Sequence, residues 1–156
     1  MKLLDWAMTT RWLRADEEQA WRAFRRLLTT LPARLARDLA ADTGLSMTDY
    51  EVLSTLSEKP ERRWALKDLA AKMEWSRSRL SHHTTRMQER GLIDREPDPD
   101  DARGCLLVLT DTGYQVLERA APFHLDSVRK RFIDHLEPAE LALLGELSTR
   151  IADLPD

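Results

Sequence analysis

The stretch that decides the fold is residues 66–91, which read LKDLAAKMEWSRSRLSHHTTRMQERG. A capping serine at Ser76 and a terminal glycine at Gly91 delimit the second of two short helices, separated by only two or three residues. The stretch therefore predicts a helix-turn-helix whose second helix is basic. The inward-facing residues expected at helical spacing are Leu66, Leu69, Ala70, Met73, Leu80, Thr84 and Met87.

The chain after Gly91 changes its apolar period from that of a helix to that of a strand. Residues 92–96 and 105–109 are strand-like, and residues 97–104 between them are rich in proline and aspartate. We therefore expect a β-hairpin directly after the helix-turn-helix, in the place of a wing.

The chain before the helix-turn-helix predicts two further helices. Asp16 and Gln19 resemble a capping box that begins a long amphipathic helix reaching Gly44, with a kink or a restart at Pro32. Residues 46–58 offer capping oxygens and an apolar face, and so predict a second, shorter helix.

The chain after the hairpin predicts two more helices, the first starting at Thr110 and the second with Pro138 as its first residue. The first has an apolar stripe at Leu117, Ala121, Leu125, Val128, Phe132 and Leu136. The second has an apolar face at Leu141, Leu144, Leu147 and Ile151.

These elements together predict a mainly α (α+β) fold, a winged helix-turn-helix, in one chain spanning 1–156. We expect a DNA-binding lobe at 45–110, flanked by dimerisation helices at 1–44 and 111–156, because one small lobe cannot cover the apolar stripes at both ends.

Charge and composition restrict the class of protein. The net charge is −3, yet nine basic and four acidic residues within 62–95 give that segment a local charge of +5. Attraction to phosphate is therefore confined to the predicted DNA-binding lobe. The single cysteine, Cys105, excludes an intrachain disulfide, and no stretch approaches the ~20 apolar residues of a membrane helix. We expect a soluble cytoplasmic protein with no membrane partner.

Several motifs together resemble the MarR family of regulators. They are LAAKMEWSRSRLS at 69–81, RMQERGLI at 86–93, the DAR of the hairpin at 101–103 and LVLTDTG at 107–113. The resemblance covers nearly the whole chain. It implies a two-fold homodimer, a repressor-like role at double-stranded DNA operators, and a small-molecule inducer.

The second helix of the helix-turn-helix carries the candidate DNA readers, because counting 100° per residue places these side chains outward or in the exposed first turn. Arg79 or Arg86 is expected to meet guanine, since a guanidinium can donate two parallel hydrogen bonds to that base. The full set of candidates is Ser76, Arg77, Ser78, Arg79, Ser81, His82, Thr85 and Arg86.

Two further groups of residues have expected roles. Arg103 at the tip of the wing is expected to enter the minor groove, with Asp101 supporting the wing. The resemblance also implies an inducer pocket, lined here by Phe24, Leu28, Tyr50 and His124.

Other classes of function have little support in the sequence. It has no glycine-rich phosphate loop, no HExxH motif and no base to pair with Cys105, so we expect no catalytic site, no metal and no cofactor. His82 and His83 diverge by about 100° on a helix and cannot share an ion. The alternative is a winged-helix module that binds a protein instead of DNA. One departure from many helix-turn-helix proteins is Glu74, which occupies a turn position often taken by glycine.

Overall fold

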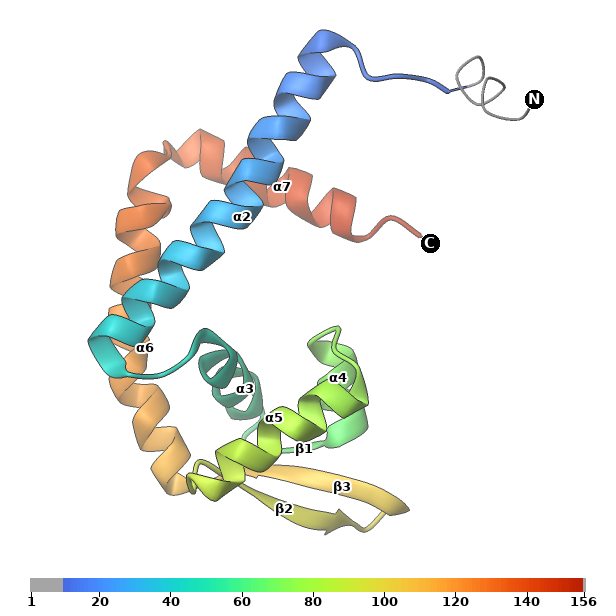
Figure 1. Cartoon of the computed structure of the whole chain (residues 1–156), viewed down its shortest axis with the longest axis vertical. Coiled ribbons are helices and arrows are strands. Elements are labelled where there is room, and N and C mark those ends of the chain that lie inside the picture. The colour runs from blue at the N-terminus through green and yellow to red at the C-terminus, as the bar shows by residue number, and fades with distance from the viewer. Residues whose placement is uncertain (1–9, 156) are drawn as a thin grey trace, which may run out of the picture. The chain divides into compact units, whose positions relative to one another are not determined.

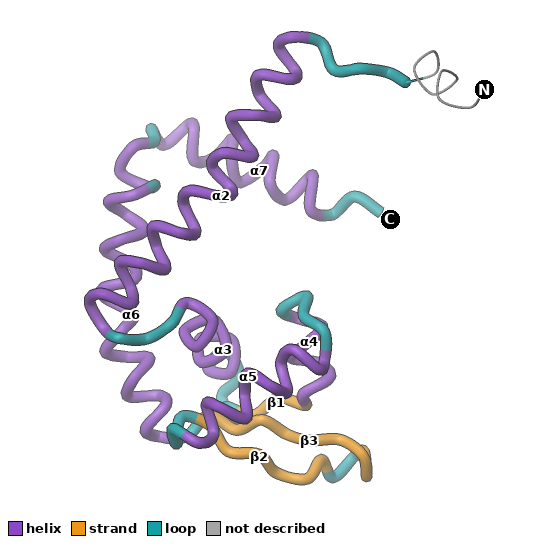
Figure 2. Tube along the Cα trace, in the orientation of Figure 1, coloured by secondary structure: helices purple, strands orange, loops and turns teal. Residues whose placement is uncertain are grey.

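The structure is a computed structural model that describes residues 10–155, apart from the side chains of Ala102 and Arg103. The chain divides into two compact units, Met1–Arg34 and Leu35–Asp156. The elements are shown in Figure 1 and, by type, in Figure 2. In chain order they are α2 (Ala15–Thr43), α3 (Met47–Ser57), β1 (Arg63–Ala65), α4 (Leu66–Lys72), α5 (Arg77–Glu89), β2 (Ile93–Asp98), β3 (Asp101–Leu109), α6 (Asp111–Arg131), the 3-10 turn η1 (Ile133–His135) and α7 (Pro138–Ala152).

Hydroxyl side chains cap three of the helices as the sequence predicts. Ser46 accepts a hydrogen bond from the backbone of Asp49 at the start of α3, and Ser76 does the same for Arg79 in α5. Thr110 caps α6 and also donates to the carbonyl of Gly91, 2.7 Å away. These caps satisfy otherwise unpaired backbone N–H groups, so the local sequence fixes where each helix begins.

The start of the first long helix differs from the sequence prediction. The Asp16–Gln19 capping box is wrong, because the backbone N–H of Arg14 instead donates to the Glu17 carboxylate at 2.9 Å. The helix also continues through Pro32 without a restart, as one segment from Ala15 to Thr43.

A three-stranded antiparallel sheet in the order β1-β3-β2 closes the lobe formed by residues 45–110 (Figure 2). The sequence prediction missed β1, which pairs Arg63 with Val108 and Ala65 with Leu106. The predicted turn at 97–104 is too long, because β3 already begins at Asp101.

The core lies between α3, α4, α5, the sheet and the first half of α6. Leu80, Thr84 and Met87 are buried on the inner face of α5, as predicted. The stripe predicted for α6 extends too far, because the helix ends at Arg131, before Phe132 and Leu136. Leu125 within the helix is 59% exposed in the single chain. Gly113, Leu117, Ala120 and Ser127 are the buried residues of that helix.

Polar contacts join the C-terminal end of α2 to α6. Asp38 accepts hydrogen bonds from Ser127 and from both donating nitrogens of Arg131, at 2.6 to 2.9 Å. Arg131 and then Ser127 lower the pKa of Asp38 to about 2. The carboxylate is therefore charged at any physiological pH.

Candidate nucleic-acid interface

The turn between α4 and α5 presents the basic helix. Glu74, at the turn position that glycine often takes, adopts a left-handed backbone conformation with φ of 54°. A non-glycine residue in this conformation costs about 1–2 kcal/mol, so neighbouring contacts must stabilise the turn. The backbone N–H of Trp75 supplies one of them by donating to the carbonyl of Ala70 at 2.9 Å.

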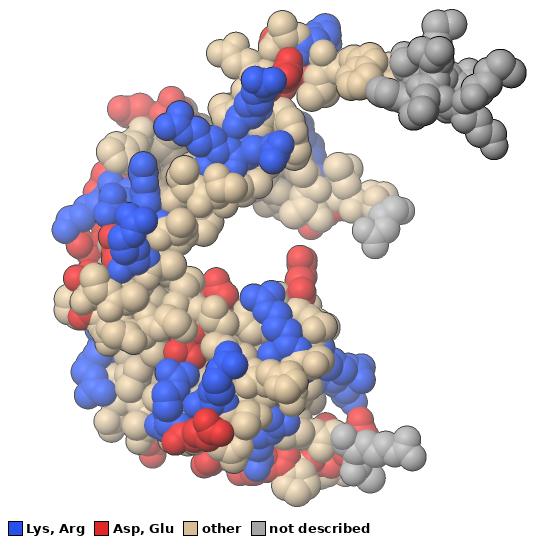
Figure 3. Space-filling model, in the orientation of Figure 1, with Lys and Arg blue, Asp and Glu red and all other residues tan. Residues whose placement is uncertain are grey.

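The outward face of α5 carries the predicted candidate readers. All of them are exposed except Ser81, which is half-buried; the exposed ones are Ser76, Arg77, Ser78, Arg79, His82, Thr85 and Arg86. Lys and Arg side chains gather over α4 and α5 in the space-filling view (Figure 3).

The two arginines expected to meet guanine are both held by neighbours. The guanidinium of Arg79 lies over the Trp75 ring, 3.9 Å from its centroid. Arg86 has its Nη2 atom 3.2 Å from Nδ1 of His83. These contacts restrict the rotamers of both arginines before any ligand binds, which reduces the entropy lost on binding.

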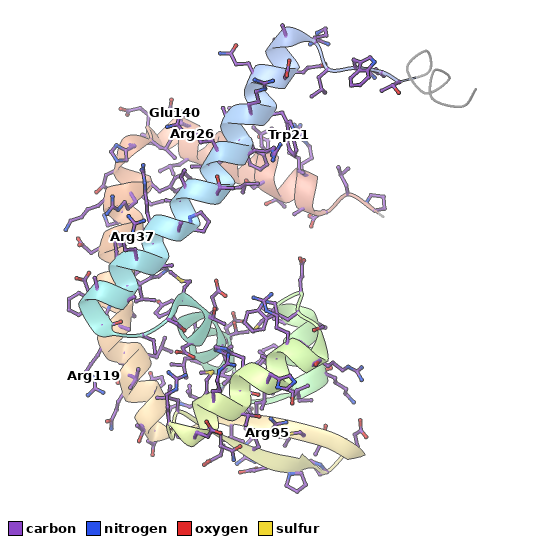
Figure 4. All side chains as sticks on the ribbon, viewed as in Figure 1. Trp21, Arg26, Arg37, Arg95, Arg119 and Glu140 are labelled. Carbon is purple, nitrogen blue, oxygen red and sulfur yellow. The ribbon has the colours of Figure 1, made fainter. Side chains whose placement is uncertain are left out.

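Arg95 contacts the candidate readers, and the sequence analysis did not include it among the site residues. It lies on β2 and projects toward α5 (Figure 4). It donates to the carbonyl and hydroxyl oxygens of Ser81, each at 3.3 Å, and to the Thr85 hydroxyl at 3.2 Å. Two predicted readers are therefore engaged with the wing. The alternation of residues along β2 could not show that Arg95 contacts Ser81 and Thr85, because these two residues lie on α5.

The wing also contacts α4. The carboxylate of Asp101 lies 3.7 Å from Nζ of Lys67. The side chain of Arg103 lies outside the described residues, so its predicted role stays a prediction. A surface depression between α5 and the wing is lined by Arg77, Ser78, Ser81, Arg95 and Cys105, among others.

An ion pair with a buried carboxylate attaches Arg90, the residue that follows α5, to α3. The Asp49 carboxylate, 5% exposed, accepts hydrogen bonds from Arg90 at 2.6 and 2.9 Å. Burial raises the pKa of Asp49, but the hydrogen bond from Arg90 and those from other neighbours lower it to a net value below its usual range. Asp49 is thus an anion that fixes the end of the basic helix.

The residues predicted to line an inducer pocket divide between the two units. Tyr50 and His124 have ring centroids 4.5 Å apart. Burial raises the pKa of Tyr50 and lowers that of His124. Phe24 and Leu28 belong to the other unit and are 47% and 54% exposed.

The described residues offer neither a metal site nor a membrane-spanning helix. No group of three or more His, Cys, Asp or Glu side chains within residues 10–155 could hold a metal ion. No helix in the same range is long and apolar enough to cross a membrane.

Comparisons with known proteins agree with this geometry. The model of the MarR family matches residues 45–105. The curated transcriptional regulator HosA of Escherichia coli O111:H- is 31% identical over 134 residues, which cover 85% of this chain and 94% of HosA.

Two solved structures from Streptomyces coelicolor, both described as MarR family transcriptional regulators, are similar over most of their length. AbsC is 41% identical with a TM-score of 0.87, covering 92% of this chain and 97% of AbsC. Sco3205, solved in complex with DNA, is 40% identical with a TM-score of 0.89, covering 94% of each chain.

Proposed function

The chain belongs to the MarR family of transcriptional regulators, and from that premise we propose that it binds an inverted repeat in double-stranded DNA as a homodimer and represses transcription there. In this proposal α5 enters the major groove and the β2–β3 hairpin reaches the adjacent minor groove through Arg103. Asp101 supports the wing from its position beside Lys67.

The observation that carries the proposal is the exposed face of α5. Its first turn presents Arg77 and Arg79, its middle presents Arg86, and the first turn holds no acidic residue. A partner-binding helix would ordinarily combine apolar anchors with few charges. This face instead offers guanidinium donors and the positive end of a helix dipole, which suit DNA bases and phosphates.

A small-molecule inducer is part of the same proposal. Nδ1 of His124 is buried and has no hydrogen-bond partner among the described residues. An unpaired buried nitrogen beside the Tyr50 ring would gain stability from a ligand that supplies a polar atom and a flat apolar surface.

The decisive experiment is selection of duplexes from a randomised pool by the wild-type protein. We expect the selected duplexes to contain an inverted repeat whose half-sites are centred roughly 10 base pairs apart, because a two-fold dimer mirrors its operator. Footprinting of the selected duplex should show two-fold symmetric protection. Recovery of unrelated sequences, or protection without symmetry, would contradict the proposal and favour a module that binds protein.

Substitution of the expected base readers gives a second prediction. Arg79→Ala or Arg86→Ala, whichever residue meets guanine, should weaken binding to the selected duplex by about 1–3 kcal/mol and relax preference at one position per half-site. Arg119→Ala on α6 is the matched control, since it removes an exposed arginine outside the lobe. Equal losses on selected and scrambled duplexes for both readers would show that neither reads a base.

A further inference from the structure

His83 lies at the centre of a continuous set of contacts along α5 that includes both arginines expected to read bases. The imidazole packs edge-on against the Trp75 ring, with centroids 6.0 Å apart and planes at 87°. Trp75 in turn lies under Arg79, and the imidazole itself reaches Arg86. The His83 side chain is only 12% exposed, and it contacts Arg86 directly and Arg79 through Trp75.

The contact with Arg86 favours a neutral ring at His83. A guanidinium has donors and no acceptor, so Nδ1 of His83 must present its lone pair to Nη2 of Arg86. The ring is then neutral and any proton lies on Nε2, which faces Oδ1 of Asp49 at 2.9 Å without being aligned for a hydrogen bond. A protonated ring would place an N–H against the Arg86 donors and lose this contact.

The charges around His83 favour the neutral ring. Asp49 on α3 faces it from one side, Arg86 and Arg90 face it from α5, and Ser46 and Glu89 line the same surface depression. Burial lowers the pKa of His83; Asp49 raises it in part, and Arg86 and Arg90 lower it further, leaving a net value below 6.5. The neutral form thus predominates at neutral pH, and acidification below this range protonates the ring.

We propose that His83 is a positioning residue for sequence recognition, whose neutral ring orients Arg86 directly and Arg79 through Trp75. The inference rests on the proposed function, because it assigns a specificity role within the DNA-reading helix. His83 itself does not contact the bases. It sets the direction in which the remaining guanidinium donors point, and protonation releases at least Arg86.

The test measures discrimination, defined as the ratio of Kd values for a scrambled duplex and for the duplex that the wild-type protein selects. It is measured between about pH 5 and pH 8, where histidine titrates and Asp49, with its lowered pKa, stays ionised. For the wild-type protein we expect discrimination to be highest near pH 8 and to decrease as the pH falls through the lowered pKa of His83.

Two variants distinguish a role of His83 in orienting Arg86 from a role in packing alone. His83→Asn places an amide oxygen near the position of Nδ1 and cannot titrate, so it should keep discrimination within about twofold of wild type at neutral pH and show no acid loss. His83→Leu removes the acceptor and should lose about tenfold at every pH, the loss expected for one hydrogen bond to a charged group. His135→Asn changes an exposed histidine outside the lobe and should follow the wild-type curve.

The outcomes are distinct. A flat wild-type curve, or an acid loss in His83→Asn equal to that of wild type, overturns the role of His83. Should His83→Leu fail to fold, as monitored by its urea midpoint, the comparison of wild type with His83→Asn still decides. Failure of the wild-type protein to select any duplex would instead contradict the proposed function, and with it this inference.

Discussion

Replacing Leu143 and Ile151 of α7 together with aspartate should leave the protein monomeric at low micromolar concentration. Both side chains are large and apolar, and they are 55% and 63% exposed in the single chain. Helical spacing places them on the same side of α7 as Leu147, and a monomer would leave this apolar surface in water. Burying four aspartates across a two-fold interface is strongly unfavourable.

The same double variant should bind the selected inverted repeat at least about 100-fold more weakly, because a monomer loses the effective concentration that joins two half-sites. Sedimentation velocity and Kd measurements on full and half-site duplexes check both effects. The matched control is Ala142→Asp with Thr149→Asp, which adds the same charges at exposed positions on the opposite side of α7. If the Leu143→Asp, Ile151→Asp variant stays dimeric, α7 does not form part of the dimer interface.

Gly113→Ala is expected to destabilise the fold by about 3 kcal/mol, at the upper end of overpacking effects. Gly113 is the third residue of α6, and a Cβ there would collide with the backbone carbonyl oxygen of Leu92 and contact Leu109. The backbone of Leu92 cannot move freely, because its carbonyl also accepts a hydrogen bond from Thr110 at 3.0 Å.

The urea midpoint of Gly113→Ala, compared with that of Gly145→Ala, checks this steric argument. A Cβ at Gly145, which lies on α7, would meet no atom within 4 Å, and its backbone is not left-handed. That substitution should be neutral or stabilise the helix by up to about 1 kcal/mol. Similar losses in both variants would show that helix propensity and not the Leu92 contact governs position 113.

Local chemistry explains why much of the fold could be predicted from the sequence. Ser46, Ser76 and Thr110 define helix starts through bonds to residues three positions ahead, and Gly91 ends α5 in a left-handed conformation. By contrast, β1 has only three residues and exists because it pairs with β3, more than forty residues later. Such non-local pairing has no local signature.

The residues of α6 that the single chain buries could not be predicted from the sequence either. The predicted stripe runs through Leu117 and Leu125, whereas the buried residues are Gly113, Leu117, Ala120 and Ser127, so only Leu117 belongs to both sets. Periodicity identifies that a helix is amphipathic and does not decide which neighbour covers which face.

The candidate interface was predictable in outline because exposure on α5 follows from helical geometry once Leu80 is placed inward. The partners of these residues were not predictable. Arg95 and Asp49 act from β2 and α3, and only the folded chain brings them to Ser81 and His83.

The contacts of Arg95 have a consequence for engineering. Because the Arg95 guanidinium on β2 bonds to both Ser81 and Thr85, α5 cannot be exchanged between relatives without regard to β2. A chimera that receives α5 from a relative without hydroxyl side chains at positions 81 and 85 would leave Arg95 with only the backbone carbonyl of residue 81 as an acceptor. Transplanted operator preference would therefore require β2 and α5 to be exchanged as one module.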